Sequence, residues 1–245
     1  MFRVLERVDS TNNYAMAMVQ SGMAKHGDAW FTHHQFSGKG QQGKVWKSKP
    51  GLNLILSVVI KPSLFFQNHP PLFNMAVAAV VATFLKNETK EEIWVKWPND
   101  LYWNDRKAGG ILIENRFSGT GWNWAVIGIG INVKQTRFPA GLPNPVSLFQ
   151  IKNREWDPET LARKLHEQLV KKLSGKFLVK TVLKTYNDIL YKKGMEVKLK
   201  KGSAQFVTCI DGVDVSGRLH THDVMERVFE YGSVEWVIRP HSLLI

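Results

Sequence analysis

One uninterrupted apolar run limits the folds open to this chain more than any other feature. Residues Asn53–Ile60 read NLILSVVI, which is rich in β-branched side chains and carries no charge. Such a run is typical of a buried strand. Residues Ala29–Gln35 (AWFTHHQ) also have the composition of a strand, and further strand-like segments lie at 93–97, 109–117 and 124–133. Together these segments predict the strands of one domain.

Helices are expected before, between and after these strands. Ser10 or Asp9 can cap a helix that runs through Met23, because a short oxygen-bearing side chain satisfies the free amides of the first turn. The proline pair at 70–71 opens a second helix of about four turns, with large apolar residues at helical spacing. A third helix starts at 157–158, where leucines recur every fourth residue. The combination indicates the α/β class.

The pattern of apolar and polar residues changes after Lys193-Gly194. Short alternating strands follow, separated by turn signals such as Lys201-Gly202 and Asp211-Gly212. Strands at this spacing indicate a small barrel or sandwich. A boundary near residue 192 therefore divides the chain into a domain at 1–192 and a smaller domain at 193–245. The predicted short strands lie at 196–200, 204–210, 215–220, 227–231 and 234–238.

Composition places the chain among ordinary globular proteins. It has 245 residues, of which 44% are apolar and 22% are charged. Charges near the start exclude a secretory signal, and the longest apolar stretch falls short of the ~20 residues of a membrane helix. The single cysteine, Cys209, excludes an internal disulfide and is expected to be a buried, unreactive thiol. A protein of the reducing cytoplasm, without a membrane partner, fits these features.

The net charge is +12, from 33 Lys and Arg against 21 Asp and Glu, and it does not by itself identify the binding partner. Basic surfaces gather phosphates, so a nucleic-acid-binding module is one interpretation. The same charge suits a protein that binds a nucleotide and docks an acidic partner. The nine tryptophans mostly fall in predicted strands, where they are more simply explained as core or interface residues.

Four short motifs carry charged or polar side chains, three of them beside glycine. Residues 38–46 read GKGQQGKVW, in which glycines let the backbone approach a ligand and lysines attract phosphate or carboxylate. The run matches G-x-G-x-x-G, but a loop and a strand follow it, so a dinucleotide-binding Rossmann unit is excluded. Residues 96–100 (KWPND) put a cation, an amide and a carboxylate on a turn stiffened by proline.

A basic pair precedes a glycine doublet in residues 106–114 (RKAGGILIE), and residues 128–133 (GIGINV) end an apolar strand in an amide. Each motif alone is also explained by ordinary structure: a flexible loop, a turn, a solvated basic pair, or a core strand with a capping asparagine. Their combination and order carry the functional interpretation.

Taken in order, these motifs resemble those of the biotin–protein ligase family. The likeness begins at Ser10-Thr11-Asn12 and Gln35 and spans nearly the whole chain. KWPND followed by the lysine–glycine strand is its most specific part, and the related lipoyl ligases lack that block in this form. The resemblance implies an α/β (α+β) mixed-sheet catalytic domain related to class II aminoacyl-tRNA synthetases, followed by a C-terminal SH3-like small β-barrel.

Many bacterial members also carry an N-terminal winged-helix DNA-binding domain. This chain begins nine residues before Ser10, so the resemblance implies the monofunctional form, with no repressor role and no DNA partner. The implied reaction activates biotin with ATP as biotinyl-5′-AMP and transfers the biotinyl group to a lysine of a biotin carboxyl carrier domain. ATP and Mg²⁺ are the implied cofactors, with Mg²⁺ bridging the pyrophosphate and no protein metal site. A homodimer through the catalytic sheet is permitted.

The resemblance also implies roles for single residues. Residues that hydrogen-bond the ureido ring or line the biotin pocket are Ser10, Thr11, Asn12, Gln35, Gly38, Lys39, Gly40, Gln41 and Gly110. Residues that bind ATP are Lys39, Lys44, Trp46, Lys96, Asn99 and Asn132, with Trp46 stacked on adenine. Lys107 is expected between the biotin carboxylate and the α-phosphate, where an ammonium lowers the repulsion between two anions.

The implied catalytic residues are Lys107, Lys96 and Asp100. Asp100 either orients the acceptor lysine and takes its proton, or is a structural carboxylate that caps the KWPND turn. An adenylate-binding loop is expected at about 135–146.

The chain departs from the family in the first motif. The family's loop usually reads G-R-G-R-x-G-R, whereas this chain has Lys39, Gln41 and Lys44 at the arginine positions. Lysine lacks the bidentate fork of arginine, and Gln41 lacks the charge. The hypothesis that follows is a leakier adenylate, or a compensating cation at Lys47 or Lys49.

The nearest alternative is a lipoate or octanoate ligase or transferase of the same fold. Such an enzyme needs a long apolar channel, whereas the polar Ser-Thr-Asn set with Gln35 favours a ureido ring. The histidines of His33-His34 and His220-x-His222 have no cysteine or carboxylate partner at a fitting spacing, so no protein metal site is predicted.

Overall fold

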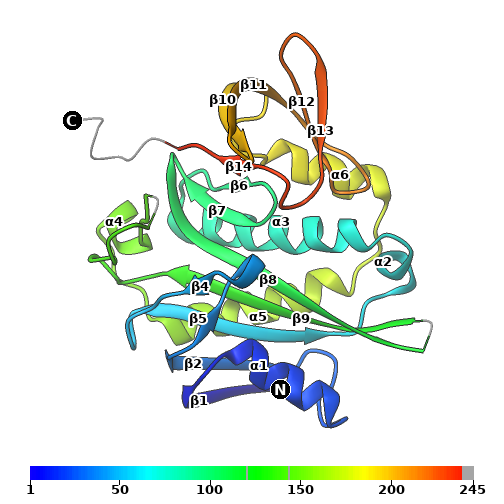
Figure 1. Ribbon diagram of the computed structural model, residues 1–245. Coiled ribbons are helices and arrows are strands. Elements are labelled where there is room, and N and C mark those ends of the chain that lie inside the picture. Colours follow the sequence, from blue (N-terminus) through cyan, green and yellow to red (C-terminus); the bar gives the residue numbers. More distant parts are fainter. Residues whose placement is uncertain (120, 143, 239–245) are drawn as a thin grey trace.

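The computed structural model describes residues 1–119, 121–142 and 144–238, and its largest element is a seven-stranded sheet (Figure 1). The strand order is β1-β2-β5-β9-β8-β7-β6. The pair β1–β2 is parallel and every other neighbouring pair is antiparallel, so the predicted mixed sheet is confirmed. The bounds are β1 (Phe2–Val8), β2 (Ala29–Gln35), β5 (Asn53–Ile60), β6 (Trp94–Lys96), β7 (Asp100–Trp103), β8 (Arg106–Ser118) and β9 (Gly121–Asn132).

Strand β5 is buried along its whole length, as its composition predicts. Its side chains alternate between the two faces of the sheet. Leu56 and Val58 pack into the larger hydrophobic core, on the face covered by α3 (Pro70–Thr89) and α5 (Pro158–Leu173). Val59 packs on the other face, beneath α1 (Thr11–Gln20). The domain therefore has three layers, with α1 on the face that carries the site (Figure 1).

Local sequence signals correctly predict where the main helices lie, but they predict the helix ends less accurately. Asp157 caps α5 by accepting from the Thr160 amide at 2.8 Å, and the four leucines of this helix are all buried. Helix α1 ends at Gln20 rather than at Met23, because Gly22 takes a left-handed φ of 73° and closes the helix. Helix α3 runs for 20 residues, beyond the expected four turns.

Several elements are not predicted by local pattern. Strand β1 lies at a sheet edge and its sequence, FRVLERV, mixes charges with apolar residues, so its pairing with β2 is set by the fold. No expected helix covers 64–68, 148–152 or 179–188. The elements without a matching expectation are β1, β3 (Gly38–Lys39), β4 (Val45–Trp46), α2 (Leu64–Asn68), β7, α4 (Leu148–Lys152) and α6 (Val179–Asp188).

A second sheet of five antiparallel strands follows α6, in the order β13-β12-β11-β10-β14. Its strands are β10 (Glu196–Lys201), β11 (Ala204–Val213), β12 (Leu219–His222), β13 (Glu226–Phe229) and β14 (Glu235–Trp236). The strand expected at 215–220 begins only at Leu219. The Asp214 carboxylate accepts from the Ser216 and Arg218 amides, which holds this segment in a turn.

The two sheets share one continuous hydrophobic core. Buried side chains of the second sheet, among them Leu199, Ile210 and Leu219, belong to the same cluster as the residues beneath α3. Residues 239–245 of the expected second domain lie outside the described residues. Within the described part of the chain, no helix is both long enough and apolar enough to cross a membrane.

Candidate functional site

A cavity of about 800 Å³ lies between the seven-stranded sheet, the 38–47 loop and the second sheet. The described wall includes nearly all of the residues singled out from the sequence. These are Ser10, Thr11, Asn12, Gln35, Lys39, Gly40, Gln41, Lys44, Trp46, Lys96, Asn99, Asp100, Lys107, Gly110 and Asn132. Among the residues given a catalytic, biotin-binding or ATP-binding role, Gly38 is the one absent from the described wall. It is buried beside the wall, where a side chain would overlap both Gln35 and the Trp46 backbone.

One end of the cavity is a buried group of neutral polar side chains. Ser10 caps α1, and the next residue, Thr11, donates its amide to Gln35 Oε1 at 2.9 Å. Ser57 Oγ lies 2.8 Å from Thr11 Oγ1 and 2.6 Å from Asn12 Oδ1. These side chains are at most 8% exposed, so a ligand here exchanges water for fixed donors and acceptors.

Ser57 does not line the described wall, but it bonds two residues that do, and the sequence reasoning missed it. Its signal is weak but present, because it is the only hydroxyl inside the apolar run of β5. The alternation of β5 turns this serine toward α1, and it fixes both Thr11 and Asn12. The orientation of the Asn12 amide is set from its other side, since Asn12 Nδ2 donates to Glu114 Oε2 at 2.8 Å. Glu114 in turn lies 3.6 Å from Lys39 Nζ.

Two glycines of β9 allow other residues to approach the sheet closely. A Cβ on Gly128 would overlap the Asn12 amide, and one on Gly130 would lie 2.5 Å from the Trp46 ring. The GIGIN pattern thus places the Asn12 amide and the Trp46 indole side by side along one strand. Trp46 Nε1 is buried and has no hydrogen-bond partner among the described residues, so it can donate to a ligand.

A charged cluster forms another part of the described wall. Asp100 Oδ1 lies 2.6 Å from Lys107 Nζ, and its Oδ2 lies 3.2 Å from Lys96 Nζ. Burial raises the pKa of Asp100, but the two ammonium groups outweigh it and hold that pKa below its usual value. Burial likewise lowers the pKa of Lys96, with the Asp100 charge opposing the shift. The cluster therefore holds two cations on a single, fully ionised carboxylate.

The KWPND turn joins β6 to β7 and is anchored from three elements. Tyr186 of α6 donates its hydroxyl to the Pro98 carbonyl at 2.9 Å. Trp97 Nε1 donates to the Gly217 carbonyl of the second sheet at 3.0 Å, and Asn99 Nδ2 donates to the Ile111 carbonyl of β8. These contacts fix the direction from which Lys96 and Asp100 enter the cavity.

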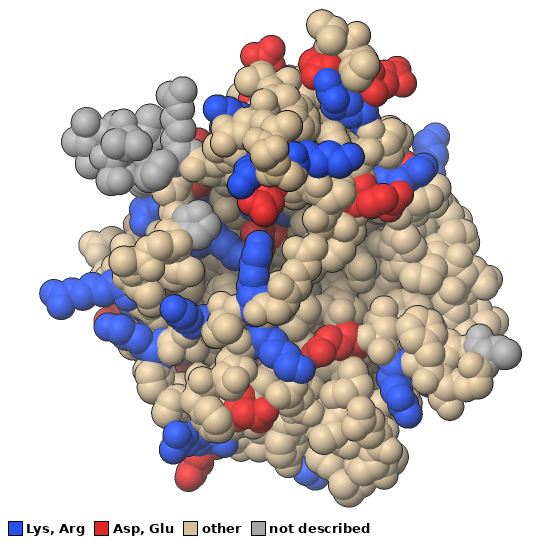
Figure 2. Space-filling view, in the orientation of Figure 1, with Lys and Arg blue, Asp and Glu red and all other residues tan. Residues whose placement is uncertain are grey.

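Positive charge dominates the described wall of the cavity. Six lysines line it, against two acidic residues, Asp100 and Glu235. Figure 2 shows Lys and Arg side chains gathered around the hollow near the middle of this face. Because Asp100 is already shared by two lysines, the described wall offers no cage of carboxylates for a free divalent cation. A Mg²⁺ ion that enters on the phosphates of a nucleotide fits this set of residues.

The second sheet closes the cavity, which the sequence reasoning did not foresee. Residues of this sheet and its turns line the wall more than 90 positions after KWPND in the chain, namely Lys200, Gln205, Tyr231, Gly232, Val234, Glu235, Trp236, Val237 and Ile238. Gly232 packs against the Gln42 side chain of the 38–47 loop, so a Cβ there would overlap it. Burial and the nearby Asp100 charge raise the pKa of Tyr231 to about 12.

The segment expected as an adenylate loop, 135–146, contributes Phe138, Leu142 and Pro145 to the described wall, and its Pro143 lies outside the described residues. Buried Gln135 accepts from Asn53 Nδ2 at 2.7 Å and from the Lys49 amide at 3.1 Å. Asn132 Nδ2 donates to the Val146 carbonyl at 3.1 Å. Of the two cations considered as substitutes for the missing arginine, Lys47 lines the described wall and Lys49 does not.

Comparisons with known proteins agree with this arrangement. The model of the biotin/lipoate A/B protein ligase family matches residues 4–132. The chain is 35% identical over 144 residues to the bifunctional ligase/repressor BirA of Escherichia coli, covering 58% of this chain and 43% of that protein. It is 32% identical over 162 residues to a biotin–[acetyl-CoA-carboxylase] ligase of Paracoccus denitrificans, covering 64% of this chain and 66% of that protein.

The fold is also found in solved structures. The biotin protein ligase from Aquifex aeolicus in complex with biotin and ATP superposes with a TM-score of 0.77 at 23% identity, covering 97% of this chain and 99% of that one. The matched part of this chain spans less than two thirds of the length of the curated relatives named above. The family model nevertheless covers more than half of the 245 residues. The chain belongs to the biotin/lipoate A/B protein ligase family.

Proposed function

We propose that the chain is a biotin–protein ligase, which activates biotin with ATP as biotinyl-5′-AMP and transfers the biotinyl group to a lysine of a biotin carboxyl carrier domain. The observation that carries the proposal is the layout of the cavity. The described wall combines a buried set of neutral donors and acceptors with a lysine cluster. The names of the relatives, which are biotin ligases, support the same assignment.

The neutral end suits the ureido ring of biotin. This ring has two N–H donors and one carbonyl acceptor in a small rigid group. Thr11, Asn12, Ser57 and Gln35 supply hydroxyl and amide groups of both kinds within hydrogen-bond range of one another. An apolar acyl chain in the same place leaves their remaining hydrogen-bonding capacity unused, at a cost of about 1–3 kcal/mol for each group that loses its water. The pocket therefore discriminates against lipoate and octanoate.

The lysine cluster suits the first chemical step. A carboxylate oxygen of biotin attacks the α-phosphorus of ATP, and the bond from that phosphorus to pyrophosphate breaks. Two anions must meet for this step, and Lys107 is the ammonium we place between them. Lys96, Lys39 and Lys44 face the phosphates, and bound Mg²⁺ supplies further charge neutralisation on the leaving pyrophosphate.

Asp100 acts in this scheme by positioning Lys107 and Lys96. Its oxygens contact both ammonium groups, at 2.6 and 3.2 Å. A carboxylate whose pKa is held below its usual value is a weak base, so it is poorly suited to take a proton from the acceptor lysine. In the second step the neutral amine of the carrier lysine attacks the carbonyl carbon of the mixed anhydride. AMP leaves and the amine loses a proton.

The nucleotide end is assigned to Trp46 and Asn132. The Trp46 ring packs on Gly130 of β9 and offers a flat surface with an unpaired indole N–H. Gln41 lines the same wall without a charge, and Lys47 lies on that wall as a substitute cation. We therefore keep the hypothesis that the adenylate escapes more readily than in relatives with arginine in this loop.

The finer assignments are proposed on the family resemblance. Residues 1–192 form a catalytic domain related to class II aminoacyl-tRNA synthetases, and residues 193–245 form a small SH3-like domain. The carrier domain of a carboxylase is the protein partner and DNA is not a partner. The enzyme works in the cytoplasm, and a homodimer can form through the catalytic sheet.

A pyrophosphate-release assay tests the proposal. Purified protein is incubated with ATP and Mg²⁺ and with biotin, lipoate or octanoate, in the presence or absence of a biotin carboxyl carrier domain. We expect release with biotin alone and labelling of the carrier when it is present. Turnover only with lipoate or octanoate would move the chain to the sister activity. No turnover with any of the three acids would refute ligase activity.

A further inference from the structure

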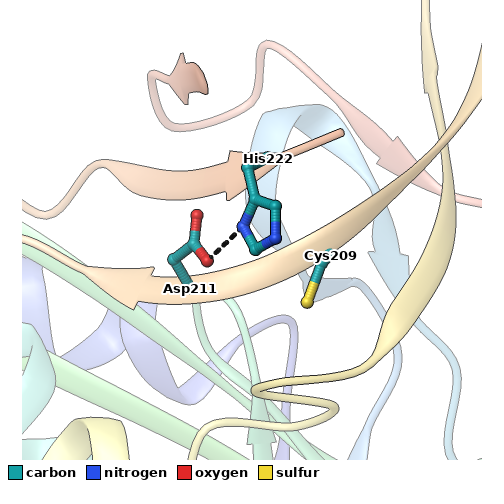
Figure 3. Close-up of side chains that lie close together, drawn as sticks. All are labelled: Cys209, Asp211 and His222. Atoms are coloured by element: carbon teal, nitrogen blue, oxygen red, sulfur yellow. Dashed lines mark hydrogen bonds and ion pairs between the residues drawn. The ribbon is translucent and has the colours of Figure 1, made fainter. Parts of the chain in front are cut away.

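A group of side chains that could coordinate a metal ion lies on the C-terminal sheet, outside the described wall of the cavity. Among the described residues, one ligand atom each from Cys209, Asp211 and His222 lies within 4.8 Å of the other two. Figure 3 shows the Asp211 carboxylate and the His222 imidazole directed toward each other, with Cys209 beside them on the same strand as Asp211. The three residues come from two adjacent strands, β11 and β12.

Sequence spacing gave the wrong expectation here. It assigned His222 no cysteine or carboxylate partner, whereas Asp211 Oδ1 lies 2.6 Å from His222 Nδ1. The partners are cross-strand neighbours, which a search along the chain does not find. Cys209 is directly paired with His222 and is half-buried rather than fully buried.

The backbone directs Asp211 toward the other two residues. The register between β11 and β12 shifts between Ile210 and Gly212, so Asp211 is the extra residue of a β-bulge. Cys209 and Asp211 are two residues apart, so strand alternation already places them on one face of β11, and the bulge adds a local bend beside Asp211. Asn187 of α6 anchors the strand next to the bulge. Its side chain accepts from the Val213 amide at 2.7 Å and donates to the Val213 carbonyl at 2.9 Å.

The neighbouring strands extend this group with further carboxylates. The sheet register aligns Glu196 of β10 with Cys209, and Glu226 of β13 with His222. Residues paired directly across strands share a face, so these four form one row on the solvent side of the sheet. Both glutamates are exposed and have flexible side chains. Either one, or water, can supply a fourth ligand.

We propose that Cys209, Asp211 and His222 bind a divalent metal ion of the zinc class across β11 and β12. A thiolate, an imidazole and a carboxylate together suit zinc or cobalt and disfavour magnesium. In a tetrahedral zinc site the ligand atoms lie about 3.3–3.6 Å apart. Small side-chain rotations reach that spacing from the observed group, and the cation takes the place of the direct Asp211–His222 contact. The bound ion joins two strands of the C-terminal sheet.

Cobalt titration of the full chain tests this site. Chelator-treated protein is titrated with Co²⁺, and thiolate-to-cobalt absorption is recorded before and after addition of Zn²⁺ and, separately, excess Mg²⁺. We expect one equivalent of Co²⁺ to produce the band, Zn²⁺ to remove it, and Mg²⁺ to leave it unchanged. Cys209→Ser should abolish the band, and His222→Ala should weaken Co²⁺ binding by roughly tenfold or more.

The matched control is His220→Ala. His220 pairs with Asp214 at 2.8 Å on the same sheet, as His222 pairs with Asp211, but the metal-ligand group defined above does not include it. This variant should bind Co²⁺ like the wild type. Circular dichroism and thermal unfolding without metal establish that each variant is folded. No thiolate-to-cobalt band in the wild type, or a band that persists unchanged in folded His222→Ala protein, would overturn the proposal.

Discussion

Replacing Asp100 with asparagine removes the charge that holds the two central lysines and leaves the size of the side chain unchanged. The carboxylate contacts Lys107 at 2.6 Å and Lys96 at 3.2 Å, and all three side chains are less than one third exposed. At an effective dielectric of about 20, these contacts correspond to gross attractions of roughly 6 and 5 kcal/mol. Desolvation offsets most of that, and removing one member of such a buried group costs about 2–5 kcal/mol.

The expected loss in the adenylation step follows from this energy. If about 2–3 kcal/mol of the cost falls on the placement of Lys107, kcat/KM for biotin-dependent pyrophosphate release falls roughly 30- to 150-fold. The pH profile should change as well. The Asp100 charge raises the pKa of Lys96, so its loss lowers that pKa. Activity that needs the Lys96 ammonium is present below this pKa and is lost as pH rises through it. The alkaline limb of Asp100→Asn should therefore lie at lower pH than in the wild type.

A double-mutant cycle separates positioning from proton transfer. If Asp100 acts through Lys107, then Asp100→Asn adds little to the defect of Lys107→Ala in the adenylation step. Fully additive losses would contradict the positioning role. Unchanged adenylation with a selective loss of transfer to the carrier would refute it and assign Asp100 to the acceptor lysine.

Three further substitutions test other parts of the cavity. Ser57→Ala removes the hydroxyl that bonds two site residues, so the Kd for biotin measured by calorimetry should rise about 5- to 30-fold; an unchanged Kd would remove Ser57 from the biotin pocket. Gly130→Ala inserts a methyl group against the indole, so KM for ATP should rise. Gly121→Ala on the same strand brings its methyl group no closer than 3.9 Å to the described residues beyond its chain neighbours, so KM should not change. Lys47→Ala should increase the biotinyl-AMP found free in solution after a single turnover, and Lys49→Ala should change it less, because only Lys47 lies on the described wall. Equal release by wild type and both variants would contradict a retaining role for Lys47.

The parts of the fold that local chemistry decides could be predicted from the sequence. Helix α5 has a capping aspartate and a four-residue leucine repeat, and both act as expected. Strand β5 is uniformly apolar and uniformly buried. Strand β1 could not be predicted in the same way, because its parallel pairing with β2 depends on contacts distant in sequence. The strand expected at 215–220 was wrong because one side chain, Asp214, captures two backbone amides.

The residues of the candidate site also fall into those that the sequence could predict and those that it could not. Motifs whose residues lie together in the sequence, such as KWPND, point directly to the cavity. Ser57 was missed because a lone serine in an apolar strand gives no periodic signal. Trp236 and Tyr231 were missed because the second sheet folds back over the cavity, which no local pattern encodes. The pairing of Cys209 with His222 was missed for a related reason, since strand register is not visible in spacing along the chain.

Mass spectrometry of a carrier domain tests the central claim most directly. The purified chain is incubated with ATP, Mg²⁺, biotin and a biotin carboxyl carrier domain, and the intact carrier is weighed and mapped. We expect a single biotinyl group on one lysine, dependent on ATP, and strongly reduced with Lys107→Ala. A carrier that remains unmodified while the folded protein and all substrates are present would contradict the account.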